Sequence, residues 1–115
     1  MWGLLLLVLV VSAGSQWWAR HSQQNLGQQV AAAAAAGDLR MLSSDSCAQC
    51  VVARNWLKEH GVPFTECSIE RDAACQQRFE ATRSPGTPVM LVRGQPQVGF
   101  SPQRVLQGLQ SRNGS

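Results

Sequence analysis

The sequence predicts an α/β domain with one four-stranded mixed sheet, preceded by an N-terminal transmembrane helix. Three observations lead to this prediction. An apolar run lies near the N-terminus, strand-like and helix-like segments alternate after residue 38, and a Cys-x-x-Cys motif separates the first strand from the first helix. With 115 residues, the chain has room for one domain. We divide it into a membrane anchor or signal segment at 1–19, a Gln/Ala-rich linker at 20–37 and a folded domain at 38–115.

Residues 1–19 contain no charged side chain, and their apolar core is about 13 residues long. Extending the segment to Trp18 gives about 18 residues, which is near the lower limit for crossing the hydrocarbon of a bilayer. Trp2, Trp17 and Trp18 would then lie at the two membrane interfaces, where tryptophan is enriched. We expect an uncleaved anchor, while a cleaved signal peptide with its processing site at Ser12-Ala13-Gly14 stays an open alternative.

The linker at 20–37 contains several glutamines and a run of alanines, Ala31 to Ala36. Alanine favours helices, so we expect a partly helical spacer that holds the domain away from the membrane. Two signals for orientation disagree. Arg20 would keep the domain in the cytoplasm, whereas four cysteines in a small domain are typical of an oxidising compartment. We expect a single-pass protein whose domain is extracytoplasmic, in the periplasm.

The first half of the domain has the pattern of a strand–helix–strand unit. Leu39–Leu42 is expected to form the first strand, and a helix follows at 47–60. The apolar face of this helix consists of Cys50, Ala53, Trp56 and Leu57. A second strand is expected at 64–69. Two strands connected by a helix form a parallel pair with a right-handed crossover.

The second half adds a helix, a hairpin and a final helix. The helix is expected at 70–82, because acidic side chains in its first turn suit the helix dipole. Strands at 88–92 and 97–100 are joined by a tight turn and must run antiparallel. The last helix, at 102–109, follows Ser101, which is a favourable N-cap. The complete order is β-α-β-α-β-β-α, with helices on both faces of the sheet.

The Cys47-Ala48-Gln49-Cys50 motif is the strongest functional signal. At a helix N-terminus, the helix dipole and the unpaired N–H groups would stabilise a thiolate on Cys47. Cys50 lies one turn later on the same face, within reach of the first sulfur, so the pair could carry two electrons. The alternatives are a permanent structural disulfide or half of a metal site.

Cys67 and Cys75 form a looser pair that could bridge the second strand and the second helix. A second, structural disulfide and two separate buried thiols remain equally open. The spacing of this pair is wrong for a zinc ribbon, so we expect no metal site built from the four cysteines.

Three motifs resemble the glutaredoxin branch of the thioredoxin superfamily, over residues 39–109. They are the Cys47–Cys50 motif after a strand, Thr87-Pro88 before the third strand, and Val98-Gly99-Phe100-Ser101-Pro102 before the last helix. The nearest subgroup resembles the redoxins that donate electrons to ribonucleotide reductase. The resemblance implies a thioredoxin (glutaredoxin-like) fold.

The resemblance also implies a role for each site residue. Cys47 would be the nucleophile, and Cys50 would resolve the mixed disulfide. Thr87 and a cis Pro88 would present backbone to an extended substrate, and Gly99 would let the partner's backbone approach closely. Phe100 would lie beside the active site or pack in the core; both interpretations stay open.

The chain departs from glutathione-dependent relatives. These have a basic residue shortly before the first cysteine and a proline after it, where this chain has Ser44, Asp45, Ser46 and Ala48. The second glycine and the aspartate that help hold the glutathione carboxylate are replaced by Phe100 and Ser101. We therefore expect no cofactor; glutathione is a candidate ligand, and these departures argue against it. Ribonucleotide reductase is an unsuitable partner for an exported domain.

The expected function is that of a membrane-tethered thiol–disulfide oxidoreductase of glutaredoxin type, acting on a protein disulfide or dithiol. The net charge is +3, and the basic residues are scattered, so no nucleic-acid partner is expected. The main alternative is a non-catalytic module of the same fold that binds an extended peptide at Thr87-Pro88. A cysteine metal site is the weaker alternative.

Overall fold

The computed structural model describes residues 1–111, and of residues 19–24 only the backbone. Arg20, one of the two orientation signals, and residues 112–115 at the end of the expected domain lie outside these described parts. In chain order the elements are α1 (Trp2–Ala33), β1 (Leu39–Ser43), α2 (Ala48–Glu59), β2 (Thr65–Ser68), α3 (Ala73–Thr82), β3 (Val89–Val92), β4 (Gln95–Val98) and α4 (Pro102–Gln110).

The four strands form one mixed sheet in the order β2-β1-β3-β4. β1 pairs with β2 in parallel, and with β3 in antiparallel orientation. β3 and β4 form an antiparallel hairpin. The predicted order of strands and helices and the mixed sheet are therefore confirmed, and the fold is thioredoxin-like.

The fourth strand was predicted at 97–100 but runs from Gln95 to Val98. Pairing begins earlier because Arg93 and Gly94 both have positive φ, 50° and 85°, which makes a two-residue turn. It ends before Gly99, whose φ of 77° departs from strand geometry. Gly99 and Phe100 therefore lie just beyond the strand.

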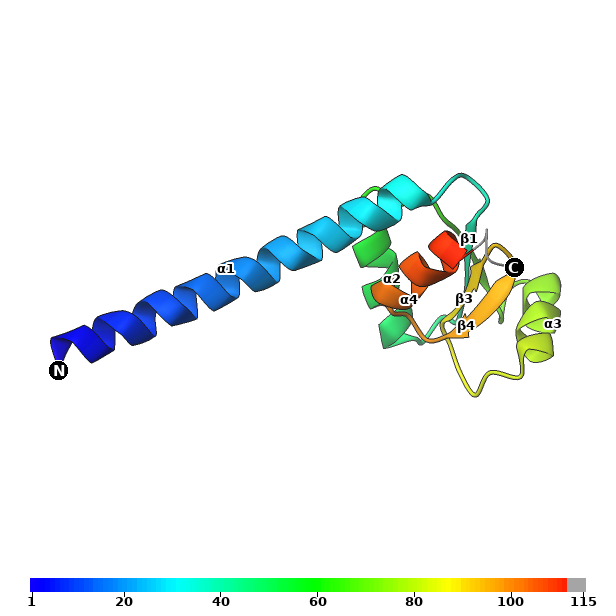
Figure 1. The fold of residues 1–115 in the computed structure, drawn as a ribbon. Coiled ribbons are helices and arrows are strands. Elements are labelled where there is room, and N and C mark those ends of the chain that lie inside the picture. Colours follow the sequence, from blue (N-terminus) through cyan, green and yellow to red (C-terminus); the bar gives the residue numbers. More distant parts are fainter. Residues whose placement is uncertain (112–115) are drawn as a thin grey trace.

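Helices cover both faces of the sheet (Figure 1). On one face, α1, α2 and α4 surround a cluster that includes Met41, Leu57, Met90 and Val105, all fully buried. On the other face, α3 covers a smaller cluster of Leu42, Cys75, Val89 and Leu91, which Cys67, Ile69 and Phe79 flank. The alternation of side chains along each strand produces this division.

The second half of α1 packs onto the domain. Val30 is fully buried in the main core cluster, and Leu26 packs against the same cluster. Gly27 lies so close to α2 that a Cβ there would be 2.1 Å from His60 Nδ1. The segment expected to be a spacer is therefore partly a core helix, because the side chains at 26 and 30 share one face.

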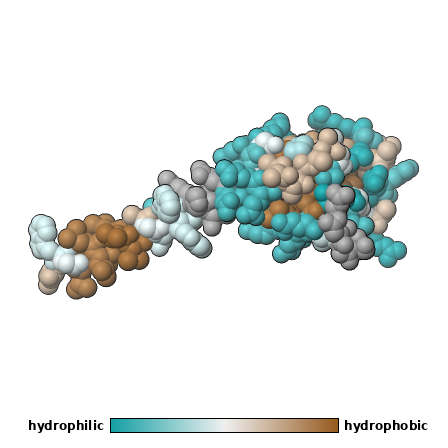
Figure 2. Space-filling model, turned by 45° about the horizontal axis from the view of Figure 1, so that its top comes forward, coloured by the Kyte–Doolittle hydropathy of each residue, from teal (hydrophilic) through white to brown (hydrophobic). Residues whose placement is uncertain are grey.

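The first half of α1 extends away from the domain, and its apolar side chains gather on the surface there (Figure 2). Leu4 is 70% exposed and Val8 is 59% exposed. Within the described residues, no helix is both long enough and apolar enough to cross a membrane. The expected transmembrane helix is therefore not supported; the apolar run is short, and Ser12–Gln16 follows it with small and polar residues.

Asp38 and Arg93 join the end of α1 to the sheet and to α4. Arg93 donates from its backbone N–H to Asp38 O at 2.7 Å and from Nη2 to Asp38 Oδ2 at 3.2 Å. The same carboxylate oxygen accepts the Ala35 N–H at 2.9 Å, and Arg93 Nη1 donates to the carbonyl of Leu109. These bonds fix the turn in which α1 passes into β1.

Val30→Ala tests whether α1 belongs to the folded unit. Removing two buried methyl groups should lower the free energy of unfolding by about 2 kcal/mol. Urea unfolding measures this as a lower midpoint at unchanged m-value. The control is Gln29→Ala, which changes an exposed neighbour on the same helix. Equal stability of the two variants would show that α1 does not share the core.

Candidate active site

Cys47 and Cys50 are joined by a disulfide at the start of α2. Cys47 is the N-cap residue of this helix, and its sulfur accepts a hydrogen bond from Cys50 N–H at 3.0 Å. Cys47 is half-buried, whereas Cys50 is fully buried. A reactant can therefore reach the first sulfur from solvent, while the second is reached only from within the protein. An N–H group directed at the sulfur also favours its thiolate form.

Thr87, Pro88 and Gly99 lie next to one another beside this motif. The Thr87–Pro88 peptide is cis, as the resemblance implies, and Pro88 is fully buried. Gly99 N–H donates to Pro88 O at 2.8 Å, and the positive φ of Gly99 is strained for any residue with a side chain. The hydroxyl groups of Ser44 and Thr87 share a hydrogen bond of 3.1 Å, which connects this region to the loop before Cys47.

Phe100 combines the two roles left open by the sequence. Its ring packs against Trp56, with centroids 5.7 Å apart, and Trp56 in turn packs against His60 at 4.4 Å. Phe100 also lines a cavity of about 280 Å³ together with Gln49 and Val52, on the α2 side of the motif. It is thus a packing residue with one face beside the active site.

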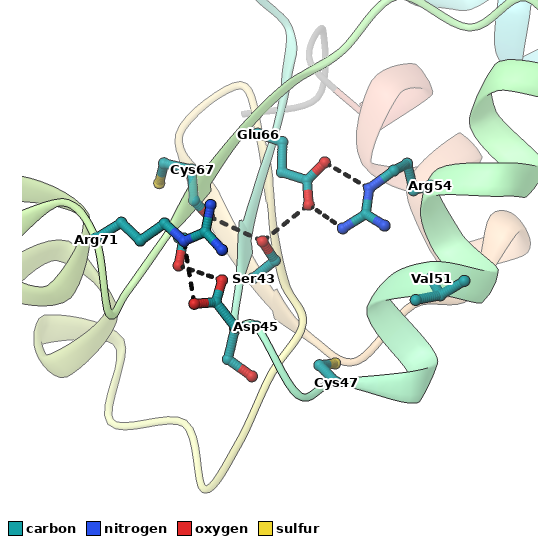
Figure 3. A pocket seen from close by; sticks show the side chains of 10 residues that line it. Ser43, Asp45, Cys47, Val51, Arg54, Glu66, Cys67 and Arg71 are labelled. Carbon is teal, nitrogen blue, oxygen red and sulfur yellow. Dashed lines mark hydrogen bonds and ion pairs between the residues drawn. The ribbon is translucent and has the colours of Figure 1, made fainter.

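A second, polar cavity of about 390 Å³ lies on the β2 side of Cys47 (Figure 3). Its lining residues are Ser43, Ser44, Asp45, Cys47, Val51, Arg54, Glu66, Cys67, Ser68 and Arg71. Both arginines are paired: Arg54 with Glu66, and Arg71 with Asp45 at 3.1 Å. The cavity is therefore polar, with its charges compensated by the protein itself.

The Arg54–Glu66 pair connects α2 to β2. Arg54 donates to both carboxylate oxygens of Glu66, and Ser43 Oγ donates to Glu66 Oε2 at 2.9 Å. The hydrogen bond from Arg54 holds the pKa of Glu66 below its usual range, although burial opposes this, and the same bond raises the pKa of Arg54. This ion pair was not predicted from the sequence. The only signal for it was one charged residue in each of two half-buried elements.

Cys67 and Cys75 are also joined by a disulfide, which connects β2 to α3. Cys67 is half-buried and lines the polar cavity, and Cys75 is fully buried. Among the described residues, no group of three or more histidine, cysteine or acidic side chains could hold a metal ion.

This geometry defines a class of protein. A Cys-x-x-Cys disulfide at a helix N-terminus, beside a cis-proline on a thioredoxin-like sheet, is the arrangement of a thiol–disulfide oxidoreductase fold. Residues 39–97 match the family model described as Glutaredoxin, which is more than half of the chain. The chain belongs to the glutaredoxin family.

Solved structures agree with this fold. The thioredoxin-like protein BC3987, in the crystal structure of a point mutant, has a TM-score of 0.57 and 25% identity, over 64% of this chain and 96% of that one. The glutaredoxin-like NrdH-redoxin from Escherichia coli has a TM-score of 0.54 and 17% identity, over 60% of this chain and 91% of that one. The holo form of glutaredoxin C1 from Populus tremula x tremuloides has a TM-score of 0.51 and 17% identity, over 78% and 97%. A comparison with curated proteins gives no match.

The Glu66 carboxylate should make stability depend on pH. Because its pKa is lower in the folded state, its contribution is complete above the unfolded value of roughly 4.3 and is lost as the pH falls through the folded value. The wild type should therefore lose more free energy of unfolding than Glu66→Gln between about pH 5 and pH 3. Urea unfolding at each pH measures this, with Glu59→Gln as the control carboxylate on α2. Parallel pH profiles for the wild type and Glu66→Gln would contradict it.

Proposed function

We propose that this protein is a thiol–disulfide oxidoreductase that exchanges electrons with disulfides in polypeptides through a dithiol mechanism. The observation that carries the proposal is the asymmetry of the motif: Cys47 is half-buried at a helix N-terminus, and Cys50 is fully buried behind it. An exposed nucleophile and a protected second thiol are what a two-step exchange requires.

The exchange takes place in two steps. In the reduced protein, the Cys47 thiolate attacks one sulfur of a substrate disulfide, and the other substrate sulfur leaves as a thiolate. Cys50 then loses its proton and attacks Cys47, forming the Cys47–Cys50 disulfide and releasing the second substrate thiolate. Two electrons pass to the substrate. The reverse sequence oxidises a substrate dithiol and leaves Cys47 and Cys50 reduced.

The surroundings of Cys47 favour a polypeptide substrate over glutathione. The backbone of Thr87, next to the cis peptide bond, lies against the loop before Cys47, and extended peptides are recognised through backbone groups. Glutathione carries carboxylates that require cations, and the arginines that line the polar cavity are already paired with Asp45 and Glu66. The residue two positions before Cys47 is acidic rather than basic.

Cys47→Ser should reduce disulfide exchange to the background rate, because a serine hydroxyl is not a nucleophile at neutral pH. Cys50→Ala should instead accumulate a mixed disulfide between Cys47 and the substrate, because the resolving thiol is absent. Insulin reduction with a dithiol as electron source, and mass spectrometry of the trapped species, measure the two effects. Asn55→Ala, on the exposed surface of α2, is the control and should retain activity. A wild-type protein inert toward disulfides and dithiols would instead favour a non-catalytic peptide-binding module.

We also propose that the domain works outside the cytoplasm. Support comes from the cysteines, since all four are joined as disulfides in the structure and such bonds persist in oxidising compartments. A membrane-impermeant thiol reagent should label Cys47 in intact cells after mild reduction. Labelling that requires cell lysis would place the domain inside.

A further inference from the structure

The Cys67–Cys75 disulfide repeats the asymmetry of the active-site pair. It closes a loop of residues 67–75 between β2 and α3, which we call the 67–75 loop. Cys67 is half-buried and lines the same polar cavity as Cys47, whereas Cys75 is fully buried. Cys67 is therefore the more accessible half of its disulfide, as Cys47 is of the active-site pair.

The 67–75 loop holds the segment that precedes Cys47. Ser68 Oγ donates to Asp45 Oδ1 at 3.1 Å. Arg71 Nε donates to Asp45 Oδ2 at 3.1 Å (Figure 3). Asp45 N–H in turn donates to Glu70 Oε2 at 3.0 Å. All three partners of Asp45 lie inside the loop that the disulfide closes, and Asp45 is two residues before Cys47. Each exposed contact is weak alone, but the three converge on one residue.

The disulfide is the covalent link of this loop to α3, and Arg71 N–H and Asp72 N–H also donate to Ser68 O at 3.3 and 3.0 Å. Cys75 is the one buried residue of α3. At the other end, Ile69 N–H donates to Ser43 O at 2.9 Å and continues the pairing of β1 with β2. Opening the disulfide would leave the strand end in place but release the α3 end, so that residues 70–72 gain conformational freedom.

We propose that Cys67–Cys75 is a second redox site, a regulatory disulfide whose reduction lowers the reactivity of Cys47 through Asp45. The inference rests on the proposed function of Cys47. The reductant is a dithiol. One of its thiolates attacks the Cys67 sulfur, the Cys67–Cys75 bond breaks, and Cys75 leaves as a thiolate that takes up a proton. The second reductant thiol displaces the Cys67 sulfur, so the reductant becomes a disulfide and two electrons pass to the pair.

The effect on Cys47 follows from charge. With the disulfide closed, Arg71 and Ser68 compensate the Asp45 carboxylate. With it open, Ser68 stays at the end of β2 but Arg71 is free to move away, so the carboxylate loses its cationic partner and disfavours a thiolate on Cys47. The other charged pair that lines the cavity, Arg54 with Glu66, connects α2 to β2 and stays intact. Strongly reducing conditions would thus reduce the activity of the protein.

The first part of the test is native-state reduction of the full chain by dithiothreitol, followed by alkylation and peptide mapping. We expect alkylation to label Cys67 in the folded protein. The dithiol concentration at which Cys67 becomes labelled should differ from the concentration at which Cys47 does. A Cys67–Cys75 bond that opens only after denaturation would overturn the proposal. This readout needs no turnover, so it is independent of whether the protein is an enzyme.

The second part compares the alkylation rate of Cys47 as a function of pH with the 67–75 loop closed and open. Both forms carry Cys50→Ala, so that Cys47 is free, and the open form adds Cys67→Ala/Cys75→Ala. The open form should react about fivefold more slowly at pH 7, with its midpoint at higher pH. Adding Asp45→Asn to the open form should restore the rate.

The control is Glu80→Gln, on the exposed surface of α3, which should leave the profile of the closed form unchanged. A purely structural disulfide would give the open form a lower Tm and an unchanged pH profile, and that result would overturn the proposal. If the profiles shift as expected while the wild type exchanges no disulfides, the proposed function fails and the coupling between the two pairs stands.

Discussion

The central position of β1 is the constraint on which the rest of the structure depends. β1 is parallel to β2 and antiparallel to β3, so its carboxyl end lies beside the carboxyl end of β2 and the amino end of β3. Ser43 pairs with Ser68, and Leu42 pairs with Val89. The loop before Cys47, the cis-proline and the 67–75 loop therefore lie together at one end of the strands. A one-residue slip of β1 would reverse its faces and separate these groups.

Cys47 therefore has two neighbouring surfaces with different chemistry. On the β3 side, the surroundings are backbone and apolar groups around Pro88, Gly99 and Phe100, which suits recognition of a chain by its main-chain atoms. On the β2 side, they are charged groups that neutralise one another. The N-terminus of α2 favours a thiolate at the Cys47 sulfur, and Asp45, two residues earlier, is paired with Arg71.

Much of the fold could be predicted from the sequence because local patterns determine it. The Cys-x-x-Cys motif, the strand–helix alternation and the turn at Arg93-Gly94 are all short-range signals. The packing of α1 against the core was not predicted because a run of alanines shows no periodic apolar face, and the fully buried Val30 lies just before that run. The Arg54–Glu66 pair and the contacts of Asp45 join distant parts of the chain, and a single sequence carries no information about such charged partners.

Because the second half of α1 packs against the core, the folded domain begins earlier in the chain than the region that matches the family model. The family match begins at residue 39, but the core includes side chains from Leu26 onward. A fragment that starts at the first strand would keep the whole redox motif and yet present to water the apolar surface that Val30 covers. Such freshly exposed surface drives self-association. The smallest fragment that should fold without self-association therefore begins within α1, ahead of β1.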